Sequence, residues 1–293
     1  MQGSFLAQDG SREGPDQPAR GTTRSIGARM PETVLITGGS GFIGRHLARA
    51  LLERGDRVRV LDSLIEQVHP TRARPAELDP DVELVEGDVR DGDRVRAALD
   101  GVDSVVHLAA EVGVGQSMYA VERYTPVNEL GTAVLFQQLI ERPVRRVAVA
   151  SSMSIYGEGL YRTEEGAVLE EVVRAGRNAE GDWDPLDNLG RALVPIPTPE
   201  GKRPALRSVY AIGKYVQERM TLTLTRQYGM EGVALRLWNI YGPGQALSNP
   251  TPASWRSSPR RSPTGSGRWS SRMASSGVTS STCAMWPGPS CSP

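Results

Sequence analysis

The sequence predicts an α/β fold in which a doubly wound parallel sheet lies between layers of helices. Two observations lead to this prediction: short apolar runs alternate with segments of helical spacing over residues 30–150, and glycine or charged residues bound each run. Continuous apolar strands are typical of parallel sheets that are buried on both faces. Right-handed connections then place the carboxyl end of every strand at one edge of the sheet.

The expected elements follow one another regularly from residue 34 onward. We expect strands over residues 34–37, 57–61, 82–85, 103–108 and 146–150, and helices over residues 43–54, 94–99 and 126–141. Asp91 precedes the second helix, where an aspartate is a favoured N-cap. A chain of 293 residues with 39% hydrophobic content can form one sizeable core with a smaller appendage.

Three further segments have a different composition. Residues 1–29 are rich in Gly, Ser, Arg, Asp and Gln, so we expect a disordered leader ahead of a start at Met30. Residues 30–250 are expected to form the domain, with an insert over residues 158–207. Residues 251–293 are rich in Ser, Arg, Pro and Gly without periodicity, and we expect a non-native or disordered tail there.

Composition narrows the classes of function. The 34 basic and 34 acidic residues balance, so no overall field would attract nucleic acid or an anionic membrane. The sequence contains no apolar run long enough to span a bilayer and no signal-peptide core, and we expect a cytoplasmic protein. The cysteines, Cys283 and Cys291, and the three histidines are too widely spaced to suggest a disulfide framework or a metal site.

A glycine-rich turn directly after the first strand is the strongest local signal. Gly38, Gly41 and Gly44 form a G-x-x-G-x-x-G pattern, and Phe42 and Ile43 open the helix that follows. Glycines allow a sharp turn that brings backbone amides against a pyrophosphate, and the helix N-terminus adds a favourable dipole. The pattern therefore predicts a dinucleotide-binding turn, although three glycines alone also match by chance.

An acidic residue at the end of the second strand supports this reading. Asp62 follows Gly44 by 18 residues, the spacing at which a carboxylate accepts the ribose hydroxyls of an adenosine. The same charge would repel a 2′-phosphate, so NAD is favoured over NADP. The alternative is an ordinary strand-end acid that caps a turn.

Two more strand ends should reach the same edge. Asp88 and Val89 follow the third strand, where an acid can meet the adenine amino group, and Leu108, Ala109 and Ala110 follow the fourth. Small residues there let the backbone approach the cofactor, although two alanines can equally form a plain turn. With the glycine turn, these positions predict a Rossmann-like sheet.

Candidate catalytic residues lie later in the chain. Ser152 ends the fifth strand, and Tyr210 and Lys214 share one face of a predicted helix. A nearby ammonium and a positive nicotinamide would favour the tyrosine phenolate, so Tyr210 could remove a hydroxyl proton while hydride leaves the same carbon. Ser152 would hold that oxygen. A Tyr and Lys pair by itself is more often an amphipathic surface pair.

Together these motifs resemble the extended short-chain dehydrogenase/reductase family, in its NAD-dependent sugar-nucleotide epimerase/dehydratase branch. The resemblance covers residues 34–250 and rests on five segments: Thr37–Gly44, Gly87–Arg90, His107–Ala110, Ser151–Gly157 and Arg236–Pro243. The long insert, Gln116–Met118 and Ser154–Tyr161 are most similar to bacterial dTDP-L-rhamnose 4-epimerases.

The resemblance implies an NAD-dependent epimerisation of a nucleotide-activated hexose, with a transient ketone at carbon four of a dTDP- or UDP-sugar. It implies that Ser152, Tyr210 and Lys214 are catalytic and that Tyr210 and Lys214 also contact NAD. Asn239, together with Ser152 and Tyr210, would bind the nucleotide sugar, and family members are commonly homodimers. Family dehydratases carry Asp-Glu after the catalytic Ser/Thr, whereas this chain has Met153 and Ser154.

Two further features of the sequence differ from the family pattern and bear on the expected activity. Ser152 and Tyr210 are 58 residues apart, and the acidic, Pro-rich insert between them is expected to fold over the sugar as a lid or to be a tolerated surface loop. Back-translation of residues 255–260 and 267–289 with GC-rich codons in another frame gives peptides that resemble the family's continuation. We therefore expect a frameshift near Pro250, which DNA resequencing tests, and a truncated substrate-binding part. The alternatives are a catalytically defective NAD-binding protein and a nucleotide-sugar oxidoreductase or decarboxylase.

Overall fold

The computed structural model describes residues 30–172 and 184–245 of the chain. Its contacts divide the chain into two units, Met1–Pro31 and Glu32–Pro293, and the first lies almost wholly outside the described residues. The predicted leader and tail also lie outside them. The description below concerns the second unit.

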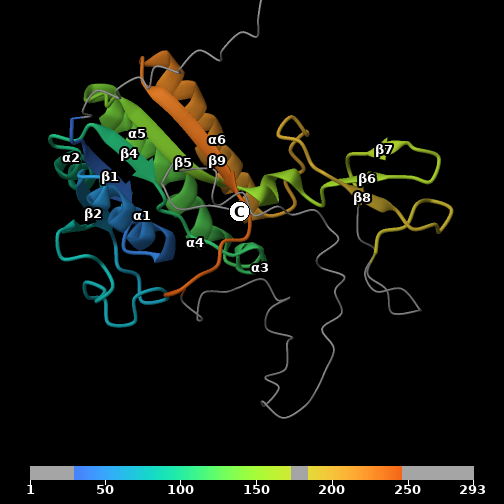
Figure 1. Ribbon diagram of the computed structural model, residues 1–293, viewed down its shortest axis with the longest axis horizontal. Coiled ribbons are helices and arrows are strands. Elements are labelled where there is room, and N and C mark those ends of the chain that lie inside the picture. Colours follow the sequence, from blue (N-terminus) through green and yellow to red (C-terminus); the bar gives the residue numbers. More distant parts are fainter. Residues whose placement is uncertain (1–29, 173–183, 246–293) are drawn as a thin grey trace, which may run out of the picture. The chain divides into compact units, whose positions relative to one another are not determined.

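A six-stranded parallel sheet forms the centre of this unit (Figure 1). The strand order is β3-β2-β1-β4-β5-β9. The strands are β1 (Thr33–Thr37), β2 (Arg57–Asp62), β3 (Glu83–Glu86), β4 (Ser104–His107), β5 (Arg146–Ser152) and β9 (Glu231–Leu237). The five strands expected from the sequence are confirmed to within two residues at each end, and so is the doubly wound α/β class.

Strand register aligns the carboxyl ends of the sheet. Thr37, the last residue of β1, pairs with Leu61 of β2 on one side and with His107 of β4 on the other. Ser152, the last residue of β5, pairs with Leu237 of β9. The glycine turn, Asp62 and Ser152 therefore leave the sheet at one edge.

Helices cover both faces of the sheet. The principal helices are α1 (Phe42–Glu53), α2 (Gly92–Ala98), α5 (Gly131–Glu141) and α6 (Val209–Gln227). Alternate strand residues enter two separate cores: Ile36 packs with Leu51 of α1, whereas Leu35 packs with Leu135 of α5. This division explains why the central strand β1 is continuously apolar from Val34 to Ile36, because it is buried from both sides.

The helix expected over residues 126–141 has a more complex start. The helical run begins earlier, with α4 (Val121–Thr125), continues through a π turn at Pro126–Leu130, and only then becomes α5. A π turn places one extra residue in the helix and commonly occurs at functional sites. A short helix, α3 (Val114–Ser117), precedes this run, and the 3₁₀ helix Met153–Tyr156 follows β5.

The described part of the insert forms its own antiparallel sheet of order β7-β6-β8. Its strands are β6 (Leu160–Arg162), β7 (Val168–Leu169) and β8 (Val194–Ile196). The returning end is fixed to the 3₁₀ helix, because the Ala205 N–H donates to the Ile155 carbonyl (2.8 Å) and the Lys202 ammonium donates to the Tyr156 carbonyl (2.7 Å).

Within residues 30–172 and 184–245, no helix is long and apolar enough to cross a membrane. The same described residues contain no cluster of three or more His, Cys, Asp or Glu side chains that could hold a metal ion.

Candidate active site

The glycine turn is packed so tightly that side chains are excluded. Gly38 has φ +68°, and a Cβ there would lie 2.8 Å from the Ala109 backbone. A Cβ on Gly44 would lie 2.4 Å from Gly39 Cα. Gly41 begins α1 without a side-chain cap, so backbone amides of the first turn are left available to an anion.

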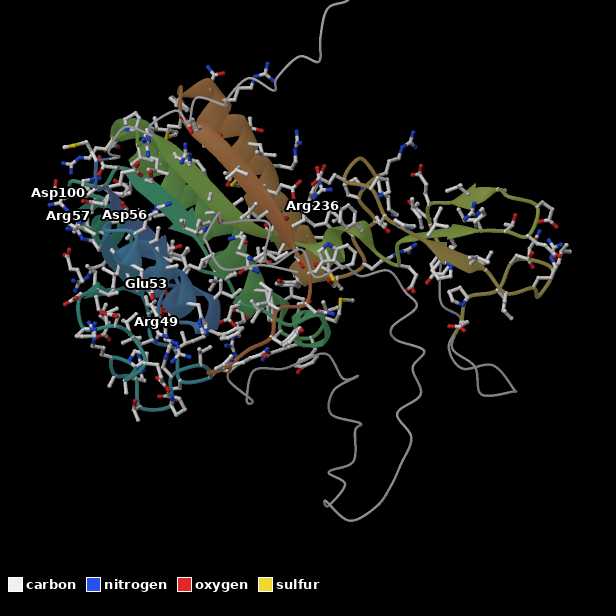
Figure 2. All side chains as sticks on the ribbon, viewed as in Figure 1. Arg49, Glu53, Asp56, Arg57, Asp100 and Arg236 are labelled. Carbon is white, nitrogen blue, oxygen red and sulfur yellow. The ribbon has the colours of Figure 1, made fainter. Side chains whose placement is uncertain are left out.

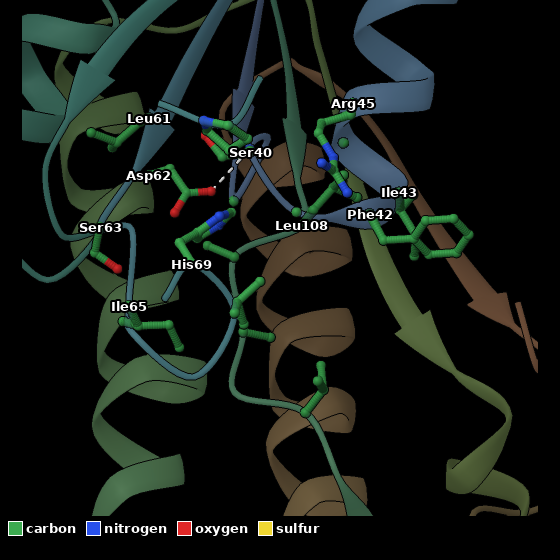
Figure 3. A pocket seen from close by; sticks show the side chains of 18 of the residues that line it. Ser40, Phe42, Ile43, Arg45, Leu61, Asp62, Ser63, Ile65, His69 and Leu108 are labelled. Atoms are coloured by element: carbon green, nitrogen blue, oxygen red, sulfur yellow. Dashed lines mark hydrogen bonds between the residues drawn. The ribbon is translucent and has the colours of Figure 1, made fainter. Parts of the chain in front are cut away.

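Asp62 connects the second strand to this turn. Its carboxylate accepts hydrogen bonds from the Ser40 N–H (3.0 Å) and the Leu64 N–H (2.9 Å), and Figure 3 shows the first of these. Each carboxylate oxygen keeps a further lone pair for a hydroxyl donor. The buried Ser40 hydroxyl has no hydrogen-bond partner among the described residues.

A cavity of about 820 Å³ opens beside the turn (Figure 3). Its lining includes the eleven residues that the sequence assigned to the cofactor alone, from the glycine turn and the ends of β2, β3 and β4. They are Gly38, Gly41, Phe42, Ile43, Gly44, Asp62, Asp88, Val89, Leu108, Ala109 and Ala110. The volume is in the range of small-molecule and cofactor sites.

Asp88 is held at the cavity by its neighbour Arg90, with an ion pair of 2.6 Å. Hydrogen bonds from Arg90 lower the pKa of the Asp88 carboxyl, so it is an acceptor at neutral pH. An acceptor at this position suits the amino group of an adenine.

The three predicted catalytic residues lie together at the carboxyl end of β5. The Tyr210 and Ser152 side chains are hydrogen-bonded, and the Lys214 Nζ lies 6.0 Å from the centroid of the Tyr210 ring. Lys214 also donates to the Ala150 carbonyl (2.9 Å). None of the three lines the described cavity. The Tyr210 N–H donates to the Ser117 hydroxyl, and Ser117 follows the cavity residue Val112 by five positions in the sequence.

Burial changes the acid–base properties of this group. It raises the pKa of the Tyr210 phenol, and the hydrogen bond with Ser152 opposes that rise. Burial lowers the pKa of Lys214 to about 7. Desolvation acts against both charged forms and the pKa of Tyr210 is raised, so the expectation that a neighbouring ammonium favours the phenolate stays a prediction.

Lys214 provides a prediction about stability. In an unfolded chain a lysine has a pKa of about 10.4, whereas Lys214 in the fold has a pKa of about 7. Between these values the unfolded state binds more protons, so the free energy of unfolding rises with pH. We expect Lys214→Met to raise the free energy of unfolding at pH 7 and to flatten this rise. Urea unfolding as a function of pH measures both, and an unchanged pH dependence would contradict the prediction.

Asn239 lies two residues beyond the end of β9, beside the segment that follows Ser152. Its side chain is exposed, and it is not among the residues that line the described cavity. The contact between Asn239 and the substrate stays a prediction.

Asn128 was missed in the sequence. This buried residue of the π turn accepts from the Glu111 N–H (2.8 Å) and donates to the Glu111 carbonyl (3.1 Å). A Cβ on Gly213 of α6 would lie 3.1 Å from Asn128 Cβ, so Asn128 also packs closely against α6. Asn128 therefore links α6 to the segment that follows β4, which contains Glu111. The sequence around Asn128 gives no clear signal, because Glu122, Arg123 and Glu129 make the same stretch polar.

His69 was also missed, because it was weighed only as a metal ligand. It lines the cavity, and Figure 3 shows it beside Asp62. Burial lowers the pKa of His69, while the Asp62 carboxylate acts in the opposite direction. A buried and mostly neutral imidazole therefore borders the expected position of the ribose.

Known proteins share this fold and these motifs. The family model described as "NAD dependent epimerase/dehydratase family" matches residues 34–176 and 193–257. A dTDP-L-rhamnose 4-epimerase of Burkholderia thailandensis is 34% identical over 221 residues, which cover 74% of this chain and 60% of that protein.

The similar solved structures include two that contain NAD. A UDP-glucose 4-epimerase of Thermus thermophilus in complex with NAD has a TM-score of 0.55 at 29% identity, covering 73% of this chain and 57% of that one. A dTDP-glucose 4,6-dehydratase of Streptomyces venezuelae with NAD bound has a TM-score of 0.53 at 30% identity, with coverage of 73% and 57%. This chain therefore spans about three-fifths of these relatives.

Proposed function

Because the chain belongs to the NAD-dependent epimerase/dehydratase family, we propose that it epimerises a nucleotide-activated hexose at carbon four, with a dTDP- or UDP-sugar as substrate. The observation that carries the proposal is the convergence of Ser152, Tyr210 and Lys214 at the sheet edge that also bears the glycine turn. Oxidation of a sugar alcohol needs a group that takes up the hydroxyl proton beside a hydride acceptor, and a phenol held by a hydroxyl can be that group.

We infer that NAD occupies the cavity beside the glycine turn. Gly38 and Gly44 leave the backbone open to a pyrophosphate, and the unpartnered Ser40 hydroxyl and the Asp62 carboxylate can bond phosphate and ribose groups. Bound there, NAD would supply the hydride acceptor that oxidation of the sugar requires. The Asp62 charge disfavours the 2′-phosphate of NADP.

In this proposal Tyr210 removes the proton from the hydroxyl on carbon four and returns it to the ketone. The single O–H of Ser152 lowers the pKa of Tyr210 when it is donated to the phenol, and holds the sugar oxygen when it is donated to the substrate. Lys214, buried beneath the tyrosine ring, supplies positive charge when it is protonated. For the product to be the other isomer, the keto sugar would have to turn over before its carbon four is reduced again, and NAD would then be recovered unchanged.

Dehydration fits this site less well. Water elimination needs an acid and a base next to the catalytic hydroxyl, and Met153 and Ser154 occupy those positions. The Ser154 hydroxyl instead donates to the Ser152 hydroxyl oxygen (2.8 Å). Neither side chain exchanges protons usefully near neutral pH.

The test is incubation with a panel of dTDP- and UDP-hexoses, followed by NMR of the sugar ring. We expect interconversion of two carbon-four isomers without net formation of NADH. Accumulation of NADH would instead support an oxidoreductase or decarboxylase. NAD binding without any conversion would support a catalytically defective NAD-binding protein.

We propose that Asn239 contacts the nucleotide sugar and that the insert covers it. Supporting this placement, the Arg236 side chain donates to the Glu200 carbonyl (2.9 Å), which holds the returning end of the insert next to β9. The 3₁₀ helix after Ser152 carries the other attachments of the insert.

We also propose that the chain forms a homodimer through α4, the π turn and α6. These elements pack together, and each exposes an apolar side chain: Val121, Leu130 and Ile212. Exposed apolar patches of this kind commonly mark protein interfaces. Sedimentation velocity should show a dimer that Leu130→Glu dissociates, and a wild-type monomer would contradict the proposal.

A further inference from the structure

Arg236 of β9 joins four parts of the second unit. Its guanidinium donates to both carboxylate oxygens of Glu218 (2.7 and 3.0 Å) and to the Glu200 carbonyl of the insert (2.9 Å). It also lies 4.9 Å from the centroid of the Tyr156 ring, in the 3₁₀ helix after Ser152. Figure 2 labels Arg236 on the side of α6 and β9 that faces the segment leading into the small sheet. An arginine fork of this kind fixes a carboxylate in both position and plane.

Glu218 lies one helical turn beyond Lys214 and is fixed to the catalytic strand. It accepts a hydrogen bond from the hydroxyl of Ser151 (2.7 Å), the residue directly before Ser152. Lys214 donates to the preceding carbonyl, that of Ala150 (2.9 Å). Two successive turns of α6 are therefore bonded to two successive residues of β5.

Glu218 is a carboxylate in this arrangement. Burial would raise the pKa of Glu218, but hydrogen bonds from Arg236 and Ser151 bring it below its ordinary value. The charged groups that act on Glu218 are Arg236 from β9 and Arg219 from its own helix. A carboxylate takes only the acceptor role, so Ser151 has to donate to it.

We propose that Arg236, through Glu218 and Ser151, is a positioning residue that sets the Ser152 hydroxyl against the Tyr210 phenol. The proposal rests on the proposed function only for the catalytic role of that phenol. Without the fork, Glu218 can rotate and release Ser151, and β5 then loses the side-chain bond to α6 that lies directly before Ser152. The hydrogen bond between Ser152 and Tyr210 should lengthen.

The test uses the pKa of Tyr210 in the full-length protein, because the hydrogen bond with Ser152 lowers that pKa. The charged and titratable groups near the phenol are Lys214 on α6 and Tyr124 on α4, and neither is altered. NMR of protein labelled at the tyrosine carbon that bears the hydroxyl follows the titration, with and without saturating NAD. Tyr210→Phe assigns the signal.

The matched control is Arg146→Gln. Arg146 forms an ion pair with Glu231 at the opposite end of the same two strands, β5 and β9 (2.8 Å), so it reports general loosening of their pairing. We expect Arg236→Gln to move the titration of Tyr210 to higher pH by about 0.5 or more. Arg146→Gln should leave it in place.

Equal titrations in the two variants would overturn the proposal. Should Arg236→Gln fail to fold, Arg236→Lys decides by the same criterion, because it keeps the charge but loses the fork. The panel of nucleotide sugars is assayed separately. A wild-type protein without turnover would count against the proposed function and leave the titration result standing.

Discussion

Replacing Tyr210 by phenylalanine is expected to lower kcat for sugar epimerisation by about 10²–10⁴, the usual contribution of a positioned acid–base group. The substitution keeps the ring and removes only the hydroxyl that is hydrogen-bonded to Ser152. The affinity for NAD should change little, because the described cavity is lined by other residues. Steady-state kinetics and a calorimetric titration with NAD measure the two effects.

Tyr228→Phe is the control for this prediction. Tyr228 caps the opposite end of α6 and its side chain is exposed, so loss of its hydroxyl should leave kcat unchanged. A Tyr210→Phe protein that keeps more than about a tenth of wild-type kcat would remove the tyrosine from the role of acid and base.

Gly38→Ala is expected to have the largest effect on cofactor binding, with the dissociation constant for NAD raised by about 100-fold or more. An alanine at φ +68° is strained by about 1–2 kcal/mol. Its Cβ would also lie 2.8 Å from the Ala109 backbone, so the glycine turn or the end of β4 has to move. Either movement displaces amides that are expected to face the pyrophosphate. Calorimetric titration with NAD measures the loss, and titration with NADP in its place should show weaker binding to the wild type.

Gly101→Ala separates strain from crowding. Gly101 has φ +67°, almost the same as Gly38, but no atom lies within 4 Å of the Cβ position. This variant should lose stability in urea unfolding through strain alone and bind NAD like the wild type. If both variants lost the same affinity for NAD, the close contact between Gly38 and Ala109 would not explain why the turn needs a glycine.

The sequence predicted the first half of the fold well because its signals there are local. Each apolar strand near the glycine turn is bounded in the sequence by glycine or charged residues. Parallel pairing of these strands then follows from the helices that connect them. The position of β9 beside β5 could not be predicted this way, because Glu231 follows Ser152 by 79 positions and the insert lies between them. The π turn was equally invisible, since Pro126 and Asn128 suit an ordinary helix start.

The same distinction applies to the site. The spacing of the glycines, of the acids at the strand ends and of the Tyr and Lys pair is enough to predict their roles. All eleven residues expected to bind only the cofactor line one cavity. Asn128, Glu218 and Arg236 act through contacts that the fold creates, so their positions in the sequence carry no comparable pattern. The lowered pKa of Lys214 could not be predicted for a related reason: it results from burial, and burial is a property of the fold.

The most direct test of the account follows one hydrogen atom. A nucleotide hexose carrying deuterium on carbon four is incubated with the protein and NAD, and the product is examined by mass spectrometry and NMR. If Tyr210 and Ser152 act beside a bound cofactor that takes and returns the same hydride, the isomerised sugar keeps deuterium on carbon four. Isomerised sugar in which that deuterium has been replaced by solvent hydrogen would contradict the mechanism.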